Sequence, residues 1–389
     1  MPPPARLLDV TRLVSRAGRV LTGVDRVEAA YLDASVADSV PVRGLCRTAL
    51  GYVLLDEDGL RAVAAARVEG WGRPDLLSRL TPRLDPDRKA GQSLVRRHAV
   101  ARARRGGLEA LLRDRLPDDV SYLSVGLSNL DAVVFDAVKA LPGARIAVMI
   151  HDTIPLDLPG MQRAGTAERF AATLSRVASR ADLILCPSHS ARADLRRHVG
   201  DAPRIEAVHL GVLPGEPGRI PAGTVSNRPY FVALGTIEPR KNHALLLDLW
   251  EREAPEADLI VCGTRGWNNE DVFARLDAGI AGVREVAGLD DGAVAALLSG
   301  SRGLLFPSLA EGFGLPMAEA AALGVPVVCG DLAVCREVLG GVGVYASTSD
   351  PYAWRRAIRA LLDGETGGAG RGYVPPSWSD HFKTVLSMA

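Results

Sequence analysis

The sequence has no long apolar run, no excess of charge of either sign and no paired cysteines, and each absence excludes a class of protein. No apolar stretch approaches the roughly 20 residues that a membrane-spanning helix requires. The 46 basic and 46 acidic side chains balance, so the overall charge does not indicate a nucleic-acid partner. The first ten residues, MPPPARLLDV, lack the apolar core of a secretory signal. We therefore expect a soluble, cytoplasmic protein.

The five cysteines are scattered along the chain, and no C-x-x-C pair marks a metal or redox site. Most of them stand in apolar, strand-like runs, which predicts buried free thiols in a reducing compartment. The chain has 389 residues, too long for one ordinary domain, and its hydrophobic content of 47% is enough for two cores. The cysteines are Cys46, Cys186, Cys262, Cys329 and Cys335.

Residues 212–228, VLPGEPGRIPAGTVSNR, are rich in Gly and Pro and have no apolar periodicity, which predicts a linker between two domains. Strand and helix patterns alternate before and after it, as in α/β domains with parallel sheets. We expect the first domain at 1–211, the second at 229–374 and a final helix at 375–389.

The strongest signal lies in residues 303–330, GLLFPSLAEGFGLPMAEAAALGVPVVCG. An apolar strand precedes a glycine-containing loop, an alanine-rich helix and a second apolar strand. Pro316 stands where the helix begins, because its missing N–H needs no partner there. This order predicts a unit of a parallel sheet whose loop lies on the side where such sheets bind ligands. We expect the strands at 303–306 and 326–329, the loop at 307–315 and the helix at 317–323.

Two glutamates in this stretch, Glu311 and Glu319, are eight positions apart, one in the loop and one in the helix, so both can face one crevice. Gly312 and Gly314 let the backbone approach a ligand closely, and the N–H groups that begin the helix favour a negative charge nearby. An ionised carboxylate only accepts hydrogen bonds, which suits it to vicinal hydroxyls. Two solvated surface glutamates are the alternative. Against it, Glu319 lies in an otherwise apolar helix, where an unpartnered charge is costly.

The pattern E-G-F-G-L-P-x-x-E, followed by A-L-G-V-P-V-V, resembles the donor-sugar signature of the family 4 retaining glycosyltransferases. The resemblance implies a GT-B fold, an α/β architecture of two Rossmann-like domains that face each other across a cleft. It also implies a nucleoside diphosphate sugar as co-substrate, with no cofactor and no metal. Glu311 would then contact the transferred sugar and Glu319 the ribose. The rest of the donor-binding loop would be Gly312, Phe313, Gly314 and Leu315.

Two positions in the first domain extend the resemblance. The buried strand at 144–152 ends in His151, where parallel sheets place ligands, and the family's histidine at this point reaches the donor sugar and its phosphate. A structural histidine is the alternative. Thr22 begins a capping-box-like helix start, and Gly23 resembles the glycine loop that lies beside the donor phosphates and acceptor. A plain helix cap is the alternative there.

The strand at 230–235 is followed by T-I-E-P-R-K-N, which resembles the diphosphate-binding segment of the family. Arg240 and Lys241 would clamp the diphosphate, and Gly235 would end the strand beside it. Relatives commonly carry another arginine directly after this glycine, where this chain has Thr236. The resemblance therefore assigns catalysis to His151, Glu311, Arg240 and Lys241.

Asp56 and Asp58 form a D-x-D pattern after an apolar run, which is a metal-binding pattern in the other large glycosyltransferase fold. A β-hairpin that turns at Asp58-Gly59 is the alternative that we favour, because the donor signature belongs to a metal-free architecture. We expect strands at 41–47 and 52–66, the second interrupted at this turn.

Residues 83–105 are strongly basic, with few large apolar residues among them. A solvated helix or loop is the simpler interpretation. The alternative is a patch that contacts anionic lipid or a phosphorylated acceptor at the inner face of a membrane. The basic residues are Arg83, Arg88, Lys89, Arg96, Arg97, Arg102, Arg104 and Arg105.

The motifs T-I-E-P-R-K-N and H-D-T-I-P look most like those of bacterial mannosyltransferases of polysaccharide assembly. The resemblance implies retaining transfer of a hexosyl group, mannosyl first, from GDP-mannose or a UDP-hexose to a hydroxyl of a glycan or lipid-linked acceptor. A sugar-nucleotide epimerase on the same fold and a non-catalytic scaffold that binds nucleotide sugar are the alternatives. Trp267 lies in a loop that borders the nucleotide base in the family, where it would stack on the base or pack in the core.

Overall fold

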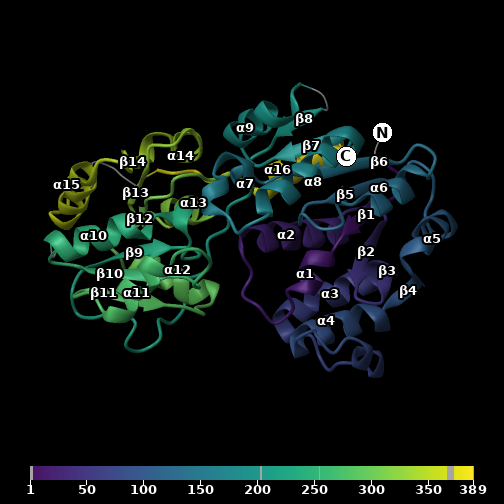
Figure 1. Ribbon diagram of the computed structural model, residues 1–389, viewed down its shortest axis with the longest axis horizontal. Helices are drawn as coiled ribbons and strands as arrows, with labels where there is room; N and C mark the ends of the chain where they lie inside the picture. The colour runs from purple at the N-terminus through teal and green to yellow at the C-terminus, as the bar shows by residue number, and fades with distance from the viewer. Residues whose placement is uncertain (1–2, 202–203, 254, 366–371, 389) are drawn as a thin grey trace.

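The computed structural model describes residues 3–201, 204–253, 255–365 and 372–388. The chain forms two α/β units, each built on its own sheet (Figure 1). The segment between them, 212–228, contains neither helix nor strand. The α/β class with two parallel-sheet domains, predicted from the sequence, is confirmed.

The first sheet has eight strands in the order β4-β3-β2-β1-β5-β6-β7-β8. The pairs β2–β3 and β3–β4 are antiparallel and all other neighbours are parallel. Alternate residues of one strand pack into different buried clusters, as Leu7 and Leu8 do, so both faces of the sheet are covered. The strands are β1 (Arg6–Asp9), β2 (Val42–Thr48), β3 (Gly51–Leu55), β4 (Ala99–Ala103), β5 (Ser121–Ser124), β6 (Arg145–Met149), β7 (Leu183–Cys186) and β8 (Ile205–Ala207).

The helices of the first unit begin at side chains that favour a helix start. Thr22 and Asp25 form a capping box, and Ser188 accepts a hydrogen bond from Ala191 N at 2.9 Å. The helices are α1 (Thr11–Ser15), α2 (Gly23–Ala37), α3 (Glu57–Glu69), α4 (Pro86–Arg97), α5 (Leu108–Arg115), α6 (Ala132–Lys139), α7 (Ile154–Asp157), α8 (Thr166–Arg180) and α9 (His189–Val199).

The predicted strand at 52–66 is wrong beyond Leu55, because the following residues form helix α3. Asp56 does not precede a hairpin turn; its side chain accepts a hydrogen bond from Gly59 N at 3.0 Å and caps the helix. The buried residues of the segment recur about every three positions, the period of a helix face, whereas a strand would bury every second one. These buried residues are Leu60, Val63 and Ala66.

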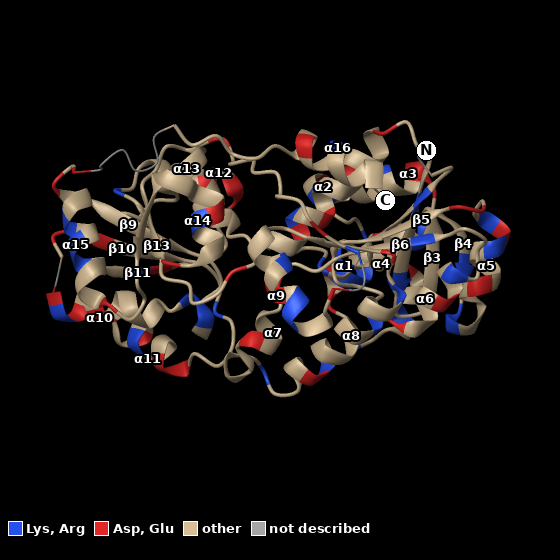
Figure 2. Cartoon of the chain, turned by 90° about the horizontal axis from the view of Figure 1, so that it is seen from above, with Lys and Arg blue, Asp and Glu red and all other residues tan. Residues whose placement is uncertain are grey.

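The basic stretch 83–105 is folded into α4, β4 and the turn after it. Arg96 is buried, with Nε and Nη2 at 2.8 and 2.6 Å from the two carboxylate oxygens of Asp75, so the predicted solvation is wrong for this residue. Arg97 and Arg102 are exposed. In Figure 2, β4 and α5 lie at the end of the molecule away from the second unit. Contact of this stretch with anionic lipid stays a prediction.

The second sheet has six parallel strands in the order β11-β10-β9-β12-β13-β14. Successive strands are added first on one side of β9 and then on the other, the doubly wound order of a Rossmann fold. The strands are β9 (Tyr230–Leu234), β10 (Asp258–Cys262), β11 (Val283–Val286), β12 (Leu304–Phe306), β13 (Val327–Gly330) and β14 (Gly343–Ala346). The helices are α10 (His243–Glu253), α11 (Glu270–Ala278), α12 (Asp291–Ser299), α13 (Leu315–Ala322), α14 (Ala333–Leu339) and α15 (Pro351–Leu362).

The last helix, α16 (Trp378–Met388), packs on the first unit (Figure 1). His381 is buried, with Nε2 at 2.8 Å from the hydroxyl of Tyr31 on α2 and Nδ1 at 2.8 Å from the carbonyl oxygen of His209. One cluster of buried apolar side chains runs from the first sheet to the second. The two units therefore share part of their core.

The five cysteines are buried free thiols, as predicted. Among the described residues, every helix is too short or too polar to cross a lipid bilayer.

We predict that Tyr31→Phe lowers the free energy of unfolding by about 1–3 kcal/mol, because it leaves a buried histidine nitrogen without its partner. Denaturant titration of the full chain measures this change. Tyr352→Phe is the matched control, since the Tyr352 side chain is 60% exposed. Equal stability of the two variants would contradict the prediction.

Candidate active site

The strand order of the second sheet reverses between β9 and β12, which is its topological switch point. The loops that follow these two strands form the centre of the site. Because both strands are parallel neighbours, their carboxyl ends open at one edge of the sheet. The loop after β9 carries Arg240 and Lys241, and the loop after β12 carries Glu311. Leu309 N donates a hydrogen bond to Arg240 O at 2.8 Å, which fixes the two loops against each other.

Glu311 and the two cations form a compact charge cluster. One carboxylate oxygen, Oε1, lies 2.9 Å from Arg240 Nη1 and 2.5 Å from Lys241 Nζ. The side chain of Glu311 is only 8% exposed. Burial raises its pKa, but Arg240 and Lys241 outweigh that effect and lower the pKa to about 2. Glu311 is therefore ionised at any working pH.

Arg240 and Lys241 each have further N–H donors that do not contact Glu311. Arg240 Nε lies 2.6 Å from Glu238, and its Nη1 also donates to Ala310 O at 3.0 Å, which leaves the N–H groups of Nη2. Lys241 Nζ lies 4.5 Å from the ring centroid of Phe306, a cation–π contact, and an ammonium carries three N–H bonds. The cluster can therefore share its cations with a further anion.

The backbone conformation at the end of β9, beside this cluster, requires glycine. Gly235 has φ +140°, a conformation that other residues rarely adopt, and a Cβ there would lie 3.4 Å from Lys241 Cε. Thr236, the next residue, packs its methyl group near Gly266.

The loop of Glu311 packs directly on the first unit. A Cβ at Gly312 would lie 2.0 Å from the carbonyl oxygen of His151, so only glycine fits. Gly312 O also accepts a hydrogen bond from the hydroxyl of Ser188 at 2.7 Å. Gly314 has φ +87° and leads into α13, and the preceding residue, Phe313, is buried. The carboxyl ends of β6 and β7 thus meet the Glu311 loop.

His151 is buried and held by one hydrogen bond. Its Nε2 lies 2.7 Å from Val125 O, which only accepts, so this nitrogen carries the proton. Burial lowers the pKa of His151 to about 4, so the ring is neutral at pH 7. The other nitrogen, Nδ1, then acts as an acceptor.

Glu319 lies on α13 and faces α2 of the first unit. Its Oε1 is 2.6 Å from Arg26 Nη1, and its side chain is 9% exposed. Burial raises its pKa, Arg26 opposes this effect, and Asp291 adds a smaller increase. The net pKa is about 7. Gly23 begins the same helix, where a Cβ would lie 3.7 Å from Leu315 Cδ1. The N-terminal turn of α2 therefore adjoins that of α13.

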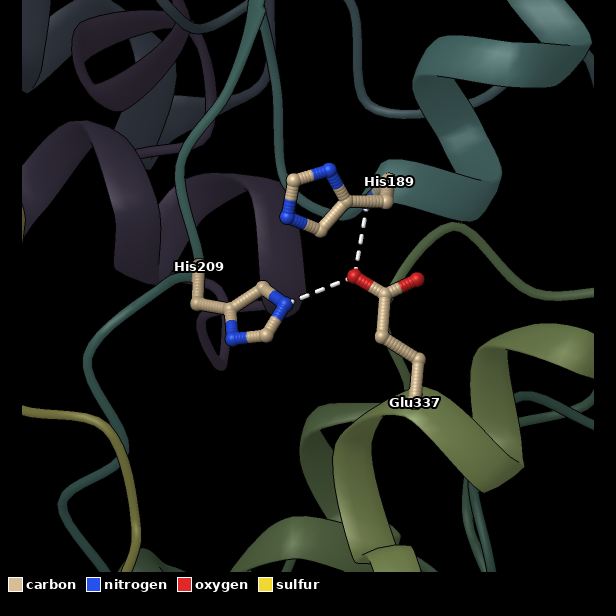
Figure 3. Close-up of side chains that lie close together, drawn as sticks. All are labelled: His189, His209 and Glu337. Atoms are coloured by element: carbon tan, nitrogen blue, oxygen red, sulfur yellow. Dashed lines mark hydrogen bonds and ion pairs between the residues drawn. The ribbon is translucent and has the colours of Figure 1, made fainter.

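Glu337 of α14, like Glu319, contacts residues of the first unit (Figure 3). Its two carboxylate oxygens accept from the backbone N–H groups of His189 and Ser190, at 2.7 and 2.9 Å, at the start of α9. His209 Nε2 lies 2.6 Å from the same carboxylate. The side chains of His189, His209 and Glu337 offer ligand atoms within 4.8 Å of one another. Because hydrogen bonds already occupy both oxygens, this contact acts as a helix cap from the opposite unit.

The two carboxylates of the D-x-D pattern make local contacts at the start of helix α3. Asp56 caps α3, and Asp58 pairs with Arg61 at 3.0 Å on the helix surface. Trp267 donates from Nε1 to Met161 O at 3.1 Å, so it contacts the first unit and does not pack in the core as the sequence alternative had it.

The strand order of the first sheet reverses between β1 and β5, and acidic residues lie near this switch point. Asp9 is buried and accepts from Thr11 N and the Tyr122 hydroxyl, both at 3.0 Å. Glu28 is also buried, and burial raises its pKa. Sequence reasoning missed both. Asp9 was detectable as a lone acid that ends an apolar strand, but Glu28 looks like any polar helix residue.

The structure therefore brings the predicted residues together in two groups, one around Glu311 and one around Glu319, with the His151 backbone beside the first. Sequence reasoning missed Arg26 and Glu238, which pair with residues of these groups, and Glu337, which caps α9. For Ser188, the sequence indicates the helix cap but not the hydrogen bond to Gly312 O. The others act across the junction or within the cluster.

We predict that Glu319→Gln stabilises the ligand-free protein more at pH 8.5 than at pH 5. The folded pKa of Glu319, about 7, exceeds the ordinary value of 4.5. The folded state therefore loses stability as pH rises from the ordinary pKa through the folded one, by up to roughly 3 kcal/mol. Gln does not ionise, so the difference between variant and wild type should grow over that interval. Denaturation at both pH values measures it, and a difference that is flat or falls with pH would contradict the assignment.

Two protein-family models match the chain. The model described as Glycosyltransferase Family 4 matches residues 80–214, and the one described as Glycosyl transferases group 1 matches residues 228–364. Among curated proteins, the serotype-specific mannosyltransferase WbdA of Escherichia coli is 30% identical over 252 residues, 58% of this chain and 31% of WbdA. The O-antigen chain mannosyltransferase B of Escherichia coli is 35% identical over 127 residues, 31% of this chain and 33% of that protein. The chain spans about a third of the length of these relatives.

Solved structures share the architecture over nearly the whole chain. Sucrose-phosphate synthase from Thermosynechococcus elongatus superposes with a TM-score of 0.67 at 16% identity, covering 99% of this chain and 96% of that one. WaaG, a glycosyltransferase involved in lipopolysaccharide biosynthesis, gives a TM-score of 0.61 at 13% identity, covering 98% and 99%. At these identities the likeness establishes the fold, which is GT-B. Taken together, the two model matches, the motif around Glu311 and this fold show that the chain belongs to the family 4 glycosyltransferases.

Proposed function

We propose that the protein is a retaining hexosyltransferase that moves a mannosyl group from a nucleoside diphosphate sugar to a hydroxyl of a glycan or lipid-linked acceptor. The observation that carries this proposal is the cluster of Glu311, Arg240 and Lys241 at the switch point of the second sheet. The loop that carries Glu311 packs against the backbone of His151 at the end of β6. Two curated relatives are named as mannosyltransferases, which supports mannose as the sugar. GDP-mannose is the first donor to test, and UDP-hexoses follow.

The donor diphosphate would lie between the cations and the start of α13. Lys241 and the Nη2 of Arg240 can donate to phosphate oxygens while Glu311 holds their other groups. The N–H groups that follow Gly314 begin α13 and add partial positive charge. Gly235 and Thr236 would line the same side of the diphosphate, and Gly23 the opposite side.

The two glutamates would divide the rest of the donor between them. Glu319 would accept hydrogen bonds from the ribose hydroxyls, and Glu311 from hydroxyls of the transferred sugar. Gly312, Phe313 and Leu315 would shape the loop around the sugar through their backbone. His151 would contribute a neutral ring whose Nδ1 accepts from a sugar hydroxyl.

The chemistry we propose proceeds on one face of the sugar. A retaining reaction with a protein nucleophile needs a free carboxylate behind the anomeric carbon, whereas the Glu311 carboxylate is bound to two cations. In the same-face route, the bond from the anomeric carbon to the diphosphate oxygen breaks while the acceptor oxygen bonds on that face. The departing diphosphate takes the acceptor proton. Arg240 and Lys241 would stabilise the charge that develops on it, so catalysis is mostly positioning and electrostatics.

The direct test is to incubate the protein with GDP-mannose or UDP-hexoses and a range of acceptors, and to determine the anomeric configuration of the product by NMR. The proposal expects a transferred sugar with the configuration of the donor. An inverted product would overturn the retaining assignment. Release of an epimerised nucleotide sugar without transfer would favour the epimerase alternative, and binding without any turnover would favour a scaffold.

We predict that substitution of the two glutamates separates binding from catalysis. Glu319→Gln should mainly raise the donor KM, because the ribose does not change charge during the reaction. Glu311→Gln should mainly lower kcat, because the sugar it contacts gains positive charge in the transition state. Each effect should be about ten- to a hundredfold, the range for a hydrogen bond to a charged group.

The matched control is Glu109→Gln, which changes a half-exposed glutamate of α5 that pairs with Arg113 on the helix surface. It should leave both constants unchanged. If Glu319→Gln lowers kcat and Glu311→Gln raises KM, the two roles are assigned the wrong way round.

We predict that activity persists without a divalent metal, because cations of the protein itself face the proposed diphosphate position and the D-x-D carboxylates serve other purposes. Titration of EDTA into the transfer assay measures this. A loss of turnover that manganese restores would contradict the prediction.

A further inference from the structure

Arg26 is a basic residue of the first unit that reaches the second unit beside the proposed donor site. It lies in the first turns of α2, and its Nη1 is 2.6 Å from Oε1 of Glu319 on α13. The Glu319 side chain is 9% exposed and that of Arg26 is 28% exposed, so the pair is largely sheltered from water. Removal of one partner of a sheltered ion pair leaves the other charge buried and uncompensated, which is costly.

Two charged groups act on the Glu319 carboxylate from the elements packed around it. Arg26 of α2 favours its ionised form, and Asp291 of α12 disfavours it, against a background of burial that raises the pKa to about 7. Arg26 is therefore the group that opposes burial and lowers the pKa of the carboxylate toward neutrality.

The turn that carries Arg26 is held rigidly within the first unit. Arg26 N donates to Thr22 O at 2.9 Å, and Thr22 forms a capping box with Asp25. The Asp25 carboxylate is itself fixed by Arg12 and Arg16, at 2.5 and 2.6 Å. The backbone from which the Arg26 side chain extends is thus fixed within the first unit, while its guanidinium pairs with Glu319 of α13.

We infer that Arg26 is a positioning residue for the nucleotide: it orients the Glu319 carboxylate across the junction and supplies its counter-charge, so that the ribose site of the second unit is complete only when the first unit is docked. This inference rests on the proposed function, in which Glu319 binds the ribose. It adds a contribution from the first unit to a site whose other groups come from the second.

The first experiment measures the dissociation constants of GDP and UDP by calorimetry at pH 7, with the full chain. Arg26→Ala should weaken binding at least tenfold, and Arg26→Lys should recover part of the loss because it restores the charge. Arg67→Ala is the matched control. Arg67 of α3 pairs with Asp33 of α2, the helix that also carries Arg26, and this ion pair lies within the first unit. Its dissociation constants should match the wild type. If Arg26→Ala binds as tightly as Arg67→Ala, the inference fails.

A double-mutant cycle separates positioning from direct contact with the nucleotide. In a Glu319→Gln background there is no carboxylate to orient or ionise, so adding Arg26→Ala should change the dissociation constant by less than about twofold. A further tenfold loss in that background would mean that Arg26 acts independently of Glu319, which overturns the inference.

The pH profile gives a readout that loss of packing would not move. The ratio of the dissociation constants of Arg26→Ala and wild type cancels the titration of the nucleotide itself. Because removal of the guanidinium raises the pKa of Glu319 further, this ratio should fall as the pH rises from neutrality through the raised pKa of the variant, where both carboxylates become ionised. A ratio that is constant from pH 6 to pH 9 would contradict the counter-charge part of the inference.

Failure of the inference and failure of the proposed function give different results. If the wild type binds neither GDP nor UDP, the proposed function fails for these donors. If the wild type binds and Glu319→Gln weakens binding, but Arg26→Ala does not, the proposed function stands and the inference alone is overturned. Should Arg26→Ala unfold, Arg26→Gln, which keeps most of the side-chain volume, carries the same test.

Discussion

The nearly buried carboxylate of Glu311 is the constraint on which the rest of the site depends. An ionised group at 8% exposure is unstable unless cations surround it, and here Arg240 and Lys241 converge on one of its oxygens. That requirement explains the local backbone. Gly235 adopts the positive φ of the turn that leads to Lys241, and Gly312 lets the loop lie against the backbone of the first unit. The charge cluster, the loop and the junction are therefore one structural solution.

Each sheet has a topological switch point, where its strand order reverses, and the side chains at the two switch points differ in type. The second sheet presents Arg240 and Lys241 with Glu311, whereas the first presents the buried acids Asp9 and Glu28. A diphosphate favours the cationic position, whereas burial raises the pKa of both acids of the first sheet, and neither offers a positive charge to a phosphate. In the proposed function, the donor therefore belongs to the second unit, and the first unit is left for the acceptor and for contacts that complete the donor site.

Three contacts join the units around that site. Arg26 pairs with Glu319, Ser188 donates to Gly312 O, and Glu337 caps α9. Each involves the proposed donor loop or a residue close to it. Docking of the units and the shape of the loop are consequently coupled, since a shift of α2 or α9 would withdraw a partner from α13 or from the loop.

The sequence predicted most elements of this fold because their signals are local. Apolar runs marked the strands, and Thr22 marked a helix start that the structure confirms. The segment after Leu55 failed because the same letters, D-E-D-G, suit both a hairpin turn and a helix cap, and the spacing of Leu60, Val63 and Ala66 was the signal that decided between them. Arg96 was misplaced because its partner Asp75 is distant in sequence. For the same reason, no local pattern could show that Arg26 meets Glu319. The roles of the site residues remain predictions that rest on resemblance and geometry.

The most direct measurement of the central claim is a crystal structure of the complex with GDP. The account predicts ribose hydroxyls within hydrogen-bond distance of Glu319 and phosphate oxygens bound by Lys241 and the N–H groups that begin α13. A nucleotide bound at the end of the first sheet, near Asp9, or one whose phosphates leave Arg240 and Lys241 uncontacted, would contradict it.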